Sequence, residues 1–115
     1  MYTPFFKNPV EEFKRCVATL KKMLNNLHDY NGMEIENYLS CRDGIEWAIG
    51  KLTNHKNLFF YLAEVNELDE KIRKNAQYIL SQMDNGFIED YRQMFNIPKK
   101  WWWWYLDEYT MEAEK

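Results

Sequence analysis

Apolar residues recur every three or four positions over most of the chain, which is the period of an amphipathic helix. The first apolar stripe consists of Phe13, Cys16, Val17, Leu20, Leu24 and Leu27. Asn8 and Pro9 stand just before this stripe. An Asn side chain accepts bonds from the free N–H groups of a first helical turn, and Pro suits the first helical position. We therefore predict a helix that begins at Pro9 and ends, or turns, at Asn31-Gly32.

A second stripe predicts a helix from about Met33 to Leu52. Its apolar positions are Ile35, Tyr38, Leu39, Ile45, Ala48, Ile49 and Leu52. Gly44 and Gly50 weaken this helix by up to about 1 kcal/mol each relative to Ala. Packing against other helices must therefore hold it, and the small residues allow another helix to approach closely.

Two further helices follow. The third runs from about Asn66 to Met83, and a short fourth begins near Phe87 and stops at Asn96-Ile97-Pro98. The segment Thr53–Glu64 is ambiguous, because its apolar run Leu58–Leu62 is too short to show a period. That run is either a helical turn or a buried extended piece.

These stripes define the expected fold class. No strand-like alternation persists over more than about five residues. We predict an all-α fold, a single small antiparallel bundle of four to five helices with an aromatic C-terminal segment packed on it. The 115 residues are expected to form a single helical-bundle domain, residues 1–115.

Composition narrows the class of partner. The formal net charge is −3, which disfavours a nucleic-acid partner because such proteins carry a clustered basic face. The longest apolar runs have six residues, whereas a bilayer span needs roughly 20, so we expect no transmembrane segment. The first residues show no secretory signal, and two cysteines are too few for a disulfide framework. We therefore expect a cytoplasmic protein.

Motifs for catalysis, metals and phosphates are missing from the sequence. Cys16 and Cys41 do not form a CxxC pair, and His28 and His55 have no ligand spacing around them. Cys16 lies on an apolar stripe and is expected to be a small buried hydrophobe. No glycine-rich phosphate loop and no nucleophile elbow occurs. We expect no enzyme activity, no metal and no cofactor.

Arg42 is the most unusual charged residue, because it falls on or beside the apolar face of the predicted second helix. Unpaired burial of a charge is expensive, so it needs a partner. Glu46 lies four residues later on a similar side. The favoured interpretation is an internal pair of Arg42 with Glu46 or with an Asp. The alternative is a polar anchor that recognises a carboxylate or phosphate.

Four consecutive tryptophans form the most distinctive segment. On a helix they spread around the axis, and on an extended chain they alternate, so one or two rings should remain outside. The run either closes the bundle as a C-terminal lid, forms a protein-protein hot spot or homodimer seam, or inserts shallowly into a membrane. The N-terminal aromatic residues Tyr2, Phe5 and Phe6 are expected to meet it on one surface.

We expect a non-catalytic protein-interaction module, a small accessory, adaptor or regulatory subunit that binds another protein or a second copy. The expected contacts are Trp101, Trp102, Trp103, Trp104, Tyr105 and, more weakly, Arg42. The alternative is a small helical enzyme or ligand-binding bundle with a polar pocket around Arg42, Glu46 and His55. A concave pocket where these three converge would favour the alternative.

Overall fold

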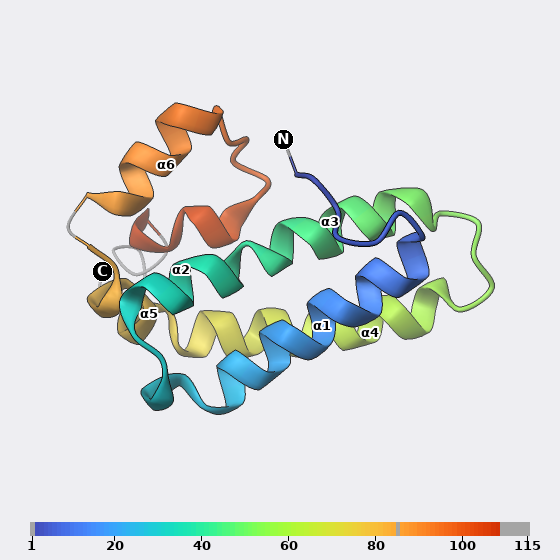
Figure 1. Cartoon of the computed structure of the whole chain (residues 1–115), viewed down its shortest axis with the longest axis horizontal. Coiled ribbons are helices and arrows are strands. Elements are labelled where there is room, and N and C mark those ends of the chain that lie inside the picture. Colours follow the sequence, from blue (N-terminus) through green and yellow to red (C-terminus); the bar gives the residue numbers. More distant parts are fainter. Residues whose placement is uncertain (1, 85, 109–115) are drawn as a thin grey trace.

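The structure is a computed structural model that describes residues 2–84 and 86–108 (Figure 1). Within these residues it contains six α-helices and no strand, which confirms the all-α prediction. The helices are α1 (Pro9–Asn25), α2 (Gly32–Leu39), α3 (Cys41–Lys51), α4 (Leu58–Lys74), α5 (Ala76–Gln82) and α6 (Phe87–Phe95). Short 3₁₀ turns cover Leu27–Asp29 and Trp102–Trp104.

Helix α1 begins where its cap predicts. The Asn8 side chain accepts hydrogen bonds from the backbone N–H groups of Val10 and Glu11, at 2.9 and 3.2 Å. The predicted end was wrong, because α1 stops at Asn25 and a 3₁₀ turn follows. Asn31 instead forms a capping box with Glu34 and starts α2.

Two predicted helices are each divided in two, which raises the number from four or five to six. Ser40 separates α2 from α3, and Asn75 separates α4 from α5. The Asn75 side chain donates to the carbonyl oxygen of Lys71 at 2.8 Å, and such local side-chain bonds compete with regular helix. In Figure 1 the α2–α3 segment runs antiparallel to both α1 and α4.

The ambiguous segment Leu58–Leu62 is helical and forms the start of α4. Its Tyr61 side chain falls in register with Val65, Leu68 and Ile72, all of which are buried. The same register turns Phe59 and Phe60 outward, where they are 87% and 71% exposed.

Gly44 allows α1 and α3 to approach closely. A Cβ atom added there would lie 2.4 Å from the Cys16 Sγ and 2.5 Å from the Tyr2 hydroxyl oxygen. No real Cβ makes such contacts, so the prediction of a close approach is confirmed here. It does not hold at Gly50, where an added Cβ would meet nothing within 4 Å.

The C-terminal segment packs into the molecule, as predicted. Trp103, Trp104 and Leu106 are essentially fully buried. Figure 1 shows this segment, in red, between α6 and the α2–α3 side of the bundle. The tryptophan segment therefore lies between helix α6 and the rest of the bundle.

Candidate functional site

Arg42, in the first turn of α3, lies inside the molecule with only 5% of its surface exposed. Its Nε and Nη2 atoms donate to the two carboxylate oxygens of Asp69 on α4, at 2.8 and 3.1 Å. Its Nη1 atom donates to Glu46 at 2.9 Å. The predicted internal pair is confirmed, and Asp69 adds a second partner that sequence spacing could not indicate.

The surroundings of Arg42 stabilise its charged form. Burial opposes the charged form, but the bonds to Asp69 and Glu46 outweigh it and raise the pKa of Arg42 above its ordinary value. The guanidinium also lies over the Trp103 ring, 4.3 Å from its centroid. Arg42 thereby joins α3 to both α4 and the tryptophan segment.

Asp43, the next residue, holds the tryptophan segment directly. A single oxygen, Oδ1, accepts hydrogen bonds from the indole N–H groups of Trp103 and Trp104, at 2.7 and 2.8 Å. Burial raises the pKa of Asp43, although the two indole bonds and the nearby Arg42 act in the opposite direction. The indole bonds pin the two rings to the start of α3.

The tryptophan run is divided between core and surface. Trp103 and Trp104 are buried, while Trp101 and Trp102 are only partly covered. Trp101 stacks on Trp103 with ring centroids 5.6 Å apart, and Trp102 lies beneath the Arg73 guanidinium at 4.4 Å. Two of the four rings thus keep some exposed surface, as the spread of consecutive residues predicts.

Helix α6 is fastened to this segment by an ion pair and a ring stack. Arg92 donates to both Asp107 oxygens, at 2.6 and 3.1 Å, and to the Trp104 carbonyl oxygen at 3.1 Å. Tyr91 stacks on Trp104 with ring centroids 4.1 Å apart. Contacts with Trp104, at the end of the tryptophan run, and with Asp107, which follows it, therefore hold α6 in position.

Two of the hollows beside α6 have aromatic residues in their lining. The first, which we call the Asp43 pocket, has a volume of about 640 Å³ and is lined in part by Tyr2, Asp43, Tyr91, Phe95, Lys100 and Trp101. The second, the α6 groove, has a volume of about 460 Å³ and is lined in part by Glu36, Ser40, Tyr91, Met94, Phe95 and Trp104. They share Ser40, Tyr91 and Phe95, so the two hollows adjoin.

A second buried carboxylate places the N-terminal segment at the Asp43 pocket. Glu12 accepts hydrogen bonds from the Tyr2 hydroxyl, the backbone N–H groups of Phe5 and Phe6, and the Arg15 guanidinium. Burial opposes ionisation of Glu12, but these bonds hold its pKa down at about 2. The chain start is thus tied to α1, and Tyr2 reaches the pocket.

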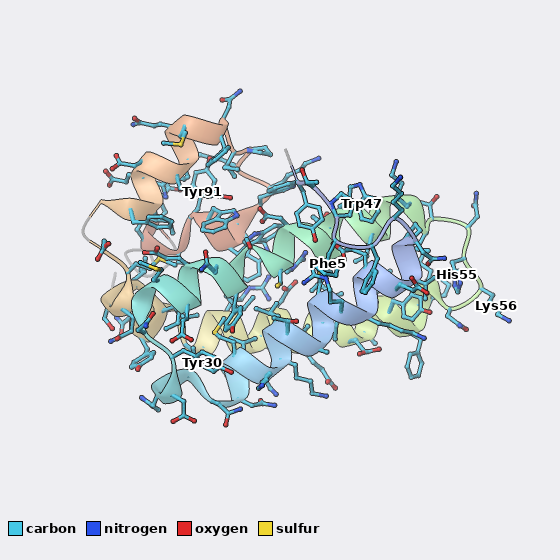
Figure 2. All side chains as sticks on the ribbon, in the orientation of Figure 1. Phe5, Tyr30, Trp47, His55, Lys56 and Tyr91 are labelled. Carbon is cyan, nitrogen blue, oxygen red and sulfur yellow. The ribbon has the colours of Figure 1, made fainter. Side chains whose placement is uncertain are left out.

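Of the two aromatic termini that were expected to meet, Tyr2 and Trp101 line one pocket. Phe5 instead packs edge-on against Phe6 and lies 5.2 Å from the Arg15 guanidinium. Figure 2 shows Phe5 beside α1 and α3, well away from Tyr91 on α6. The burial of Glu12 was not predicted from the sequence, although its position four residues before the buried Cys16 on one helix is a signal of it.

Arg42, Glu46 and His55 do not converge on a pocket. His55 packs against Tyr61 with ring centroids 5.5 Å apart, and its Nδ1 accepts a bond from the Asn57 backbone N–H at 3.0 Å. Figure 2 places it at the opposite end of the long axis from Tyr91. None of the three residues lines the Asp43 pocket or the α6 groove.

Across residues 2–84 and 86–108, no group of three or more His, Cys, Asp or Glu side chains is arranged to hold a metal ion. The same residues contain no helix with the length and apolar character that a membrane span requires. No protein-family model, curated protein or solved structure shows a significant match to this chain.

Proposed function

We propose that the chain is a non-catalytic protein-interaction module whose partner protein binds across the Asp43 pocket and the α6 groove. The observation that carries this proposal is the junction of the two hollows at an exposed apolar edge. Phe95 is 49% exposed there and Met94 is 75% exposed. Apolar and aromatic side chains beside a concave surface are typical of interaction hot spots.

The contact surface differs from the one expected from the sequence. Trp103, Trp104 and Arg42 are buried, and we assign them a positioning role. Trp101 keeps exposed surface at the Asp43 pocket and remains a proposed contact. The ion pairs and ring stacks below α6 hold this surface in place, which lowers the entropy lost on binding.

A cytoplasmic site of action belongs to the same proposal. Cys16 and Cys41 are free and buried. Free thiols are the ordinary state of cysteine in a reducing compartment.

The test is site-specific photocrosslinking in the native cell. A photoreactive phenylalanine analogue replaces Phe95 in one variant and Phe59 in a matched control. Phe59 is also an exposed aromatic residue, at 87%, but lies on α4. We expect a discrete crosslinked protein from position 95 and none from position 59.

The crosslinked protein is then purified and its affinity measured by calorimetry. Phe95→Ser is expected to weaken binding about tenfold or more, while Phe59→Ser leaves it unchanged. The proposal is overturned if position 95 captures nothing, or if affinity is the same for both variants.

A further inference from the structure

The cysteines Cys16 and Cys41 meet where α1 and α3 pack against each other. Figure 1 shows the two helices, in blue and green, side by side. A Cβ atom added to Gly44 of α3 would lie 2.4 Å from the Cys16 Sγ, so the Cys16 side chain points at this helix. Cys41 is three residues before Gly44, one turn earlier on the same face of α3. The structure accordingly holds the two thiols in hydrogen-bond contact.

The surroundings make the two thiols unequal. The Arg15 guanidinium donates from Nη2 to the Cys16 Sγ at 3.5 Å, and the Tyr2 hydroxyl oxygen lies at the same distance. The hydrogen bond from Cys41, helped by these two groups, lowers the pKa of Cys16 below its ordinary value, although burial and Glu12 oppose it. The same hydrogen bond and burial raise the pKa of Cys41. Since the thiolate is the reactive form of cysteine, Cys16 is the better nucleophile.

The Cys16 sulfur lies one side chain away from solvent. Cys16 itself has no exposed surface, but the Arg15 side chain that contacts its sulfur is 31% exposed. Exposed side chains change rotamer within nanoseconds. Movement of Arg15 therefore admits a molecule as small as hydrogen peroxide to the sulfur.

We propose that Cys16 and Cys41 form a reversible intrachain disulfide when a hydroperoxide oxidises the chain. The Cys16 thiolate attacks one oxygen of hydrogen peroxide, the O–O bond breaks, and hydroxide leaves and takes up the proton that Cys16 released. Cys16 is then a sulfenic acid. The Cys41 sulfur attacks the Cys16 sulfur, the S–O bond breaks, and the hydroxyl group leaves as water with the Cys41 proton. Two thiols are oxidised to one disulfide, and one peroxide is reduced to two water molecules.

This disulfide joins α1 to the first turn of α3, directly before Arg42 and Asp43. Neither cysteine lines the Asp43 pocket or the α6 groove. The inference is therefore independent of the proposed function, and each can fail without the other.

The test uses the whole reduced chain at neutral pH with a small molar excess of hydrogen peroxide. After quenching, the chain is unfolded in urea, the remaining thiols are alkylated, and the intact mass is measured without reductant. We expect a monomer that is lighter by two hydrogen atoms, carries no alkyl group and regains both thiols with dithiothreitol. The inference is overturned if both thiols persist, if the disulfide joins separate copies, or if oxidation requires urea.

Two single-cysteine variants test the roles. In Cys41→Ser the Cys16 sulfenic acid has no thiol to react with, so dimedone should trap it. In Cys16→Ser the remaining Cys41 thiol should react with peroxide at least about tenfold more slowly. Equal rates in the two folded variants contradict the assignment of the nucleophile. Should either fail to fold by circular dichroism, the disulfide measurement on the wild-type chain decides.

The contribution of the cation is tested with Arg15→Gln. Losing the positive charge beside the sulfur should slow oxidation of Cys16 severalfold. Lys14→Gln is the matched control, because it removes the same charge from an exposed neighbouring position of α1 and should oxidise at the wild-type rate. An equal rate for the two variants contradicts the role of Arg15.

Discussion

The variant Asp69→Ala measures how much the buried Arg42–Asp69 ion pair contributes to the free energy of unfolding. In Asp69→Ala, Arg42 loses two of its three hydrogen-bonded contacts while remaining 5% exposed. Removing one partner from a buried pair costs about 3–5 kcal/mol, because the other charge is left without compensation. Glu46 still accepts one bond at 2.9 Å, so we expect the lower end, about 3 kcal/mol.

A loss of this size is large for a chain of 115 residues. Domains are stable by only about 5–15 kcal/mol. The assay is urea unfolding followed by far-ultraviolet circular dichroism. With a slope of about 1–3 kcal/mol per molar, the midpoint should fall by roughly 1–3 M. Glu70→Ala is the control, because this neighbouring acid is exposed, and it should change stability by no more than about 0.5 kcal/mol.

A double variant separates the charge effect from packing. Replacing the pair by Arg42→Met with Asp69→Leu removes both charges and keeps apolar volume. Such replacements of buried pairs are often neutral or stabilising, so the double variant should be clearly more stable than Asp69→Ala. The reasoning is refuted if the free energy of unfolding of Asp69→Ala falls by less than about 1 kcal/mol with an unchanged dependence on urea concentration. It is also refuted if the double variant is no more stable than Asp69→Ala.

Three further outcomes are expected. Glu12 has a pKa of about 2 in the fold against an ordinary 4.5, so its contribution to stability is present above about pH 4.5 and is lost as the pH falls toward 2. In wild type the urea midpoint should therefore fall between pH 4.5 and pH 2. In Glu12→Gln the midpoint should fall less over the same range. Gly44→Ala should destabilise by about 1–3 kcal/mol in thermal melts, since its Cβ would lie 2.4 Å from Cys16, whereas Gly50→Ala in open space should gain up to about 1 kcal/mol; equal effects would contradict the close approach. Asp43→Leu leaves two buried indole N–H groups without an acceptor and should cost about 2–4 kcal/mol, with tryptophan fluorescence reporting loss of the C-terminal packing.

Helix positions were predictable wherever the deciding contacts are local. The Asn8 cap and the stripe that includes Phe13 and Leu20 lie within one helix, so the sequence alone indicated them correctly. Asn31-Gly32 was assigned to the wrong helix end, because Asn and Gly occur at both starts and ends. The capping partner Glu34, three residues later, is the signal that distinguishes a start.

The candidate site was less predictable, since its contacts join distant parts of the chain. The Arg42–Glu46 pair follows from a four-residue spacing on one helix. Asp69 lies 27 residues from Arg42, and the indole donors lie 60 and 61 residues from Asp43. No local spacing encodes such pairs. The position of Arg42 on an apolar face indicates that it needs an acidic partner, but not which acid of another helix provides it.

The division of the tryptophan run follows from the position of one acceptor. A buried indole N–H needs a hydrogen-bond acceptor, and Asp43 provides one oxygen to two of the four rings. Within residues 2–84 and 86–108, no acceptor bonds to the indole N–H groups of Trp101 and Trp102. These two rings are only partly covered: Trp101 is stacked on Trp103, and Trp102 lies under Arg73. Asp43, which accepts the bonds of the two buried indole rings, also lines the pocket that Trp101 lines.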